Sequence, residues 1–214
     1  MIWLTDEIEF PKPESASEEG VIALGGDLSE KRLLLAYQNG IFPWYSDDDP
    51  IIWYCPPERM VLFPEELKVS KSMKQLIKKG NYSITENTAF SEVIFNCKHI
   101  LRTDDFGTWI TDEMEEAYIN LHAKGIAKSI EVWFYDAETR KQVLVGGLYG
   151  IDLGNGVFCG ESMFSLISNA SKLAFIHLVQ NHNYKLIDCQ VYNNHLASLG
   201  AREIYREEFL KILG

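Results

Sequence analysis

An acid and an amide stand two residues apart in the apolar segment of residues 185–200, KLIDCQVYNNHLASLG. The first half of this segment has the composition of a strand, and side chains on a strand alternate between its faces. Asp188 and Gln190 should therefore share one face, and Cys189 should point to the other. A buried carboxylate is costly unless it is paired or hydrogen-bonded. The pair is thus either a satisfied polar contact at the end of a sheet or a site where a proton moves.

The elements that must position this pair follow from the periodicity of the sequence before it. Three strands joined by the turns DAETRK and DLGNG form an expected antiparallel meander. A helix and then the strand that carries Asp188 come next. The expected ranges are 129–136, 143–152 and 156–164 for the strands, 168–183 for the helix and 185–191 for the last strand.

This order predicts an α+β class with a mixed sheet. It resembles the acyltransferase fold of the N-acetyltransferases that use acetyl-CoA. Those enzymes cradle a pyrophosphate with a glycine-rich loop at a helix N-terminus. The corresponding segment here, SMFSLISNASK, has no glycine. The fold is therefore expected to be N-acetyltransferase-like (GNAT-like) without the usual CoA loop.

A basic helix is expected over residues 71–79. Ser70 can cap it and Gly80 can end it, and helices are also expected over residues 89–101 and 111–125. The segment KVSKSMKQLIKK contains five lysines and no acid. Its lysines at i, i+3 and i+7 share one face. This helix is either an ordinary solvated surface or a dock for phosphates.

Composition bounds the remaining possibilities. The 214 residues are 46% hydrophobic and carry a net charge of −11, which argues against a strongly basic nucleic-acid-binding protein. The four cysteines form no CxxC pair, which favours reduced thiols over a zinc site. No apolar run is long enough to span a membrane, and the start lacks the pattern of a signal peptide. We expect a soluble cytoplasmic protein, with a small N-terminal domain at residues 1–57 and a catalytic domain at 58–214.

Seven segments, in one order, resemble one family. They are ALGGDLSEKRLLLAYQNGIFPWYS, GTWIT, IEVW, GGLYG, FCGESMFS, NASK and LIDCQVYNNHLASLGA. Together they closely resemble the leucyl/phenylalanyl-tRNA–protein transferases over residues 10–209. The resemblance implies transfer of Leu or Phe from Leu-tRNA or Phe-tRNA to proteins that begin with Arg or Lys, which marks them for bacterial N-end-rule degradation. It implies no metal and no other cofactor, and we expect a monomer.

The resemblance also assigns roles to residues of this chain. The catalytic set is Asp188, Gln190 and Glu161. Trp44 and Trp109 match the aromatics at the terminal adenosine of the tRNA. The amino-acid side-chain pocket is matched by Leu148, Phe158, Met163, Phe175, Leu178 and Ile187. The tRNA backbone contacts are matched by Lys71, Lys74, Lys78 and Lys79.

Three questions stay open at the level of the sequence. Asp188 could orient Gln190, which would hold the attacking amine, or the proton could be removed directly by Asp188 or by the substrate's own groups. His195 is interpreted as structural or as a support for the residues that contact the substrate, because no Ser–His–Asp motif surrounds it. A CoA-dependent acetyltransferase and a non-catalytic tRNA-binding module remain as rival functions.

Overall fold

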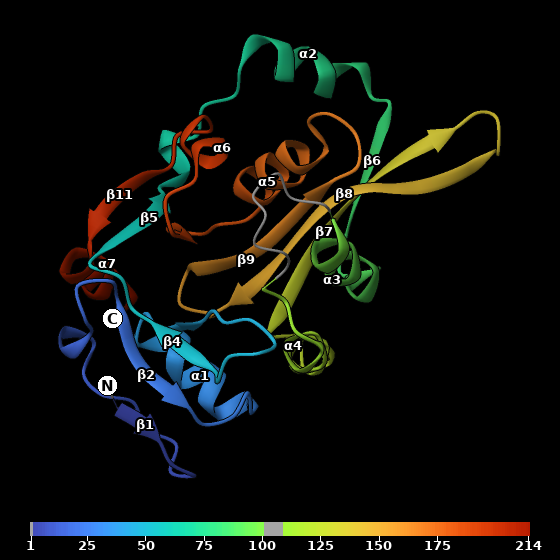
Figure 1. Cartoon of the computed structure of the whole chain (residues 1–214). Helices are drawn as coiled ribbons and strands as arrows, with labels where there is room; N and C mark the ends of the chain where they lie inside the picture. The colour runs from blue at the N-terminus through green and yellow to red at the C-terminus, as the bar shows by residue number, and fades with distance from the viewer. Residues whose placement is uncertain (1, 101–108) are drawn as a thin grey trace.

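Two β-sheets organise the chain in the computed structural model, which describes residues 2–100 and 109–214 (Figure 1). The smaller sheet has the strand order β1-β2-β4-β3 and the larger one β11-β5-β10-β9-β8-β7-β6. The small sheet consists of β1 (Ile2–Leu4), β2 (Val21–Gly25), β3 (Phe42–Pro43) and β4 (Ile52–Tyr54). The large sheet consists of β5 (Glu58–Leu62), β6 (Tyr82–Glu86), β7 (Ala127–Asp136), β8 (Lys141–Asp152), β9 (Val157–Ser165), β10 (Leu186–Gln190) and β11 (Arg202–Tyr205).

The large sheet is mixed. Strands β9 and β10 run parallel, and the other neighbouring strands in it are antiparallel. The meander β7–β8–β9, a helix and the parallel strand β10 follow one another as expected. The predicted α+β class with a mixed sheet is confirmed.

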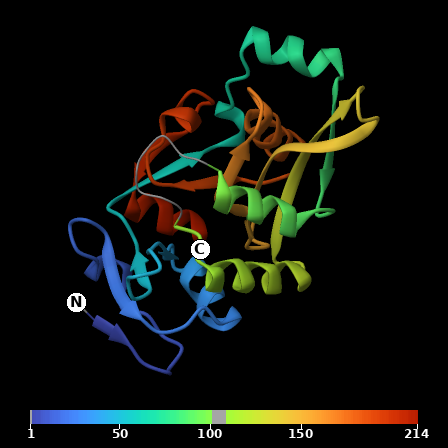
Figure 2. The same cartoon turned by 45° about the vertical axis from the view of Figure 1, so that its right-hand side comes forward.

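Helices cover both faces of this sheet. On one face lies α5 (Ala170–Asn181), and on the other lie α3 (Phe90–His99) and α4 (Asp112–Ala123). Figure 2 shows α4 beside α1 (Glu30–Gln38), the helix that follows β2. Helix α2 (Lys71–Lys79) stands at the far end of the molecule from the small sheet, and the C-terminal part adds α6 (Asn194–Ala197) and α7 (Arg206–Leu213) (Figure 1).

Local capping signals set several of these helices. The Ser70 side chain accepts a hydrogen bond from the Met73 N–H, and Gly80 closes α2 with a φ of 68°. Thr111 caps α4 in the same way through the Met114 N–H. Both caps confirm the predicted starts. The helix expected over 89–101 ends at His99, and Leu101 lies outside the described residues, as do two residues of the GTWIT segment.

The sequence did not predict the strands of the small sheet, nor β5, β6 and β11. Each of these strands has five residues or fewer, and β11 is mostly polar. Such strands lack the long alternation that makes a strand visible in a sequence. The chain passes from the small to the large sheet between Tyr54 and Glu58. One hydrophobic cluster spans both sheets, with Trp53 and Val61 among its members, and a division at residue 57 stays a prediction.

Candidate active site

The parallel strands β9 and β10 separate, and the site lies where they do. Strand β10 pairs with β9 only from Leu186 to Asp188, whereas β9 continues to Ser165. At Gln190 the backbone has a φ of 62°, and the register with β5 shifts between Asp188 and Gln190. The strand therefore bends away from its neighbour, and strict alternation fails at Gln190. A cavity of about 700 Å³ occupies the opening.

A bulge in β9 brings Glu161 to this opening. Gly150 of β8 pairs with Gly160, and Tyr149 pairs with Ser162, so Glu161 is the extra residue between them. Its side chain is buried and lies on the side of the sheet that α4 covers. Gly150 permits the close approach of the strands, because a Cβ there would lie 2.3 Å from the Cys159 carbonyl oxygen.

Asp188 is held by a cation that the sequence analysis missed. The Arg59 Nε and Nη2 donate to the two carboxylate oxygens of Asp188 at 2.7 and 2.6 Å. The third guanidinium nitrogen donates to the Gly40 carbonyl at 3.1 Å. The rings of Phe42 and Phe209 lie 4.5 and 4.7 Å from the guanidinium carbon. This buried, bidentate ion pair fixes the Asp188 carboxylate in place.

Gln190 connects this ion pair to Glu161. The Gln190 backbone N–H donates to Asp188 Oδ1 at 2.9 Å, and its side-chain Nε2 donates to Glu161 Oε1 at 2.8 Å. Asp188 and Gln190 are thus joined through the backbone of Gln190, while the Gln190 side chain is oriented by Glu161. With Nε2 committed to Glu161, the Gln190 carbonyl oxygen can accept a hydrogen bond from a ligand in the cavity.

Two buried tyrosines complete a hydrogen-bonded array with Arg59, Asp188, Gln190 and Glu161. The Tyr118 hydroxyl donates to Glu161 Oε2 at 2.9 Å and shares a short hydrogen bond with the Tyr37 hydroxyl. Burial raises the pKa of Glu161 to about 7, although the hydrogen bonds from the tyrosines lower it. A carboxyl group that titrates near neutral pH therefore faces the cavity beside the Gln190 amide.

The pH dependence of stability tests this environment. The pKa of Glu161 is about 7 in the fold against 4.5 ordinarily, so proton binding to Glu161 stabilises the fold. This stabilising contribution is fully present below pH 4.5. That contribution is lost as the pH rises through 7, and it amounts to about 3 kcal/mol. We expect the free energy of unfolding of the wild type, measured relative to Glu161→Gln, to fall by this amount between pH 4.5 and 7.5. Urea titrations across this range measure it, and a constant difference would contradict the assignment.

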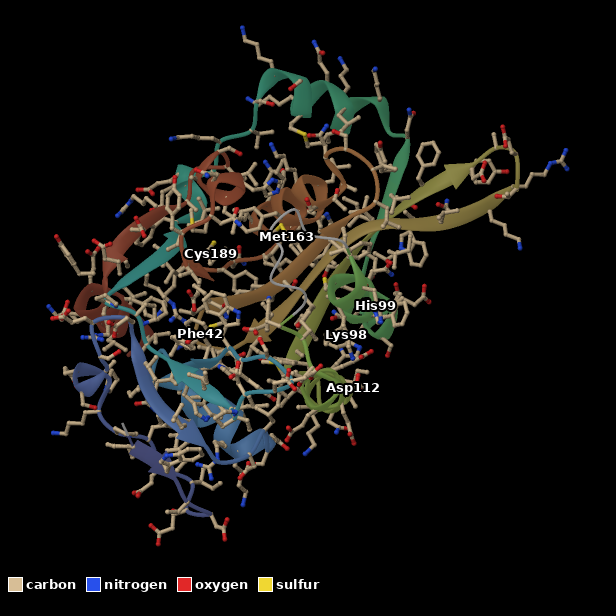
Figure 3. The ribbon with its side chains drawn as sticks, in the orientation of Figure 1. Phe42, Lys98, His99, Asp112, Met163 and Cys189 are labelled. Atoms are coloured by element: carbon tan, nitrogen blue, oxygen red, sulfur yellow. The ribbon has the colours of Figure 1, made fainter. Side chains whose placement is uncertain are left out.

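The apolar residues expected to form a side-chain pocket line the same cavity. They come from β8, β9, α5 and β10, and all but the half-buried Met163 are buried. They are Leu148, Phe158, Met163, Phe175, Leu178 and Ile187. Trp44, which is 42% exposed, and the half-buried Trp109 line it too. Figure 3 labels three lining residues from different strands, Phe42, Met163 and Cys189.

Other residues singled out from the sequence lie at the edge of the site or away from it. Burial raises the pKa of Cys189, which keeps its thiol protonated at neutral pH and makes it a poor nucleophile. His195 lines the cavity, with the Ser171 hydroxyl 3.5 Å from its Nε2. The lysines of α2 lie outside the cavity and are all exposed, namely Lys71, Lys74, Lys78 and Lys79.

Comparison with known families decides the relationship. The family model described as leucyl/phenylalanyl-tRNA protein transferase matches residues 61–214, and the model of its N-terminal domain matches residues 26–57. The chain belongs to the leucyl/phenylalanyl-tRNA–protein transferase family. It is an aminoacyltransferase, which sets aside the alternative of a non-catalytic binding module.

Relatives named leucyl/phenylalanyl-tRNA–protein transferase match the transferase over nearly its whole length. The one from Flavobacterium johnsoniae is 57% identical over 100% of this chain and 99% of its own. The one from Shigella dysenteriae is 52% identical over 96% of this chain and 86% of its own.

Solved structures resemble the transferase more weakly. FemX has a TM-score of 0.48 at 10% identity, covering 86% of this chain and 70% of its own. A GCN5-related N-acetyltransferase from Kribbella flavida has a TM-score of 0.39 at 10% identity, covering 78% and 58%. At these scores neither structure bears on the reaction of the transferase.

The missed residues of the array left only faint signals in the sequence. Arg59 is the lone cation inside the apolar run RMVLF, which hints at a buried partner. Tyr37 and Tyr118 are 81 residues apart on two different helices, and nothing local indicates that their hydroxyls meet.

Of the helices in the part of the chain that the structure describes, none is long and apolar enough to cross a membrane.

Proposed function

We propose that this transferase moves Leu or Phe from Leu-tRNA or Phe-tRNA to the N-terminal α-amine of proteins that begin with Arg or Lys. One observation carries the proposal. A single cavity combines an apolar pocket, two indoles and the Gln190–Glu161 array. The product would be marked for N-end-rule degradation.

The parts of the donor fit different walls of this cavity. The amino-acid side chain would enter the apolar pocket under α5, where the flexible Met163 suits two shapes of side chain. The terminal adenine would stack on Trp44 and Trp109, because every base offers a π face to an indole. The ester carbonyl would then lie near Gln190, on the polar side of the opening.

The reaction is aminolysis of an ester. The α-amine nitrogen attacks the ester carbonyl, a C–N bond forms, and the C–O bond to the terminal ribose breaks. The amine loses a proton and the departing ribose oxygen gains one. An α-amine has a pKa of about 8, so a sizeable neutral fraction is present without a strong base. Gln190 would hold that amine through its carbonyl oxygen, as a positioning group.

Asp188 contributes to this arrangement through the backbone. Its carboxylate is engaged by Arg59 and by the Gln190 N–H. We therefore assign Asp188 to fixing the bend at Gln190, and we give it no proton to remove. Glu161 orients the Gln190 amide and supplies negative charge beside the cationic amine.

Acidic groups near Tyr45, which follows the cavity-lining Trp44 in the chain, support the choice of Arg or Lys acceptors. Burial raises the pKa of the Tyr45 hydroxyl, the hydrogen bond with Thr111 lowers it, and the charges of Glu113 and Asp47 raise it further. A cationic first side chain of the acceptor would be attracted to these carboxylates.

The proposal is tested by transfer of labelled Leu or Phe from tRNA to peptides that begin with Arg, Lys, Asp or Met. Label should appear only on the Arg and Lys peptides. Absence of transfer to every peptide would refute the proposed reaction.

Because one chain supplies the whole array, we propose a monomer, acting in the cytoplasm where charged tRNA is present. Sedimentation during turnover measures the oligomeric state.

Binding of the tRNA should separate electrostatic from stacking interactions. We propose that the exposed lysines of α2 contact the tRNA backbone, so replacing them with Gln should reduce the slope of log affinity against log salt by about 0.7–0.9 for each phosphate that is no longer neutralised. Trp44→Ala should instead weaken binding by about 1–3 kcal/mol at every salt concentration. Lys211→Gln, an exposed charge on α7, is the matched control. An unchanged slope in the α2 variant would contradict the assignment.

A further inference from the structure

A second cavity lies directly behind the apolar pocket. It has a volume of about 260 Å³, and it shares two lining residues, Phe158 and Leu178, with the active-site cavity. These two side chains therefore form a partition between the cavities. We call the second one the rear cavity.

On its rear side the partition meets the Tyr184 ring and the space of the rear cavity. The Phe158 ring packs against Tyr184 with ring centres 5.4 Å apart and planes tilted by 47°. The Tyr184 hydroxyl donates to Asp152 at 3.2 Å, and the His182 ring stacks on the Tyr184 ring with ring centres 5.4 Å apart. Protein interiors are otherwise packed as densely as organic crystals. A void of this size behind a buried phenylalanine gives that ring somewhere to move.

The walls of the rear cavity suit exchange with water. Most of its other lining residues are polar, and Asn87 is exposed, so the cavity reaches the surface. The polar lining consists of Glu86, Asn87, Lys128, Ser129, Asp152, His182 and, through its hydroxyl, Tyr184. Water can occupy such a space and leave it when a side chain enters. Movement of Phe158 would therefore displace solvent and would not compress the core.

A pocket that accepts both leucine and phenylalanine must solve a packing problem. A rigid pocket shaped for phenylalanine leaves a void around leucine, and one shaped for leucine is overpacked by phenylalanine. A movable wall with free space behind it avoids both costs. The partition between the two cavities has this arrangement.

We propose that the rear cavity sets the selectivity between Phe and Leu donors by receiving the Phe158 ring when the larger side chain is bound. This inference rests on the proposed function. It makes Tyr184 and Ile130, which line or back the rear cavity without lining the active-site cavity, determinants of specificity.

Two substitutions of opposite sign test it. Tyr184→Leu enlarges the space behind Phe158 and should raise the Phe:Leu ratio of kcat/KM about tenfold, within the range that one or two methylenes supply in apolar pockets. Ile130→Phe fills the rear cavity and should lower the ratio by a similar factor. General damage to the fold would not move the ratio in opposite directions.

Matched controls come from the same hydrophobic cluster. Tyr82 packs on Phe134 with ring centres 5.7 Å apart and planes tilted by 51°, and it lines neither cavity. Tyr82→Leu should leave the Phe:Leu ratio within twofold of the wild type. Val132→Leu, also in that cluster, controls for added bulk in β7.

Binding separates this inference from the proposed reaction. The dissociation constants of the 3′-amide analogues of leucyl- and phenylalanyl-adenosine should shift in the same directions as kcat/KM. A wild type that binds both analogues but transfers neither amino acid would refute the reaction, while the binding ratios still decide the role of the cavity. Ratios within twofold of the wild type in folded Tyr184→Leu would overturn the inference, even where Ile130→Phe fails to fold.

Discussion

Arg59→Met is expected to lower the free energy of unfolding by about 3–5 kcal/mol and to reduce transfer to background. The substitution leaves the Asp188 carboxylate buried without its cation, and breaking one side of a buried pair costs an amount of this order. It also frees the carboxylate that holds the Gln190 backbone. Urea denaturation measures the first effect, and single-turnover transfer measures the second.

Two further variants separate stability from function. Removing both partners, in Arg59→Met with Asp188→Leu, should recover a large part of the stability, because no uncompensated charge remains. It should not recover transfer, because the hydrogen bond to the Gln190 N–H is gone. Arg59→Lys keeps the charge but loses the bidentate geometry, and it should lie between the wild type and Arg59→Met. Full transfer in the double variant would show that the ion pair serves stability alone.

Gln190→Gly is expected to reduce kcat about 100-fold, as loss of a positioning group does, while stability is retained or increased. Gln190 has a φ of 62°, a region that glycine adopts without strain. Stability and activity should therefore change in opposite directions, as at other sites where strain is kept for function. Gln190→Ala should show the same fall in kcat without the gain in stability.

Arg140→Gly is the matched control for this backbone effect. Arg140 has a φ of 56° in the turn between β7 and β8, and it does not line the active-site cavity. The same change there should alter stability in the same sense and leave kcat within twofold. The kcat values and melting temperatures of Gln190→Gly, Gln190→Ala and Arg140→Gly, each compared with the wild type, separate the backbone effect from the side-chain effect. A Gln190→Gly variant with normal kcat would exclude the side chain from the reaction.

The network also explains why the site depends on both sheets. Tyr37 comes from α1, next to the small sheet, and Tyr118 from α4, which packs on the large one. Their hydroxyls share a hydrogen bond, and the Tyr118 hydroxyl donates to Glu161. Damage to the packing between α1 and α4 would therefore reach Gln190 through Glu161, although neither helix lines the cavity.

Much of the local structure could be predicted from the sequence alone. Ser70 and Gly80 bound α2, Thr111 starts α4, and the strands from β7 to β10 follow from alternation and turn residues. These signals act over a few residues, so they are visible without the fold. The motifs also indicated the family, and the side chains that they singled out for the reaction, adenosine and apolar pocket do line one cavity.

How those side chains are held became evident only in the folded chain. Arg59 meets Asp188 across 129 residues, and no local pattern indicates that its strand β5 pairs with β10. The bulge at Glu161 and the bend at Gln190 are set by pairing with neighbouring strands. The cavity exists because two parallel strands part after a few residues. That divergence depends on the whole sheet and on burial of charges that are distant in sequence, and no local pattern encodes it.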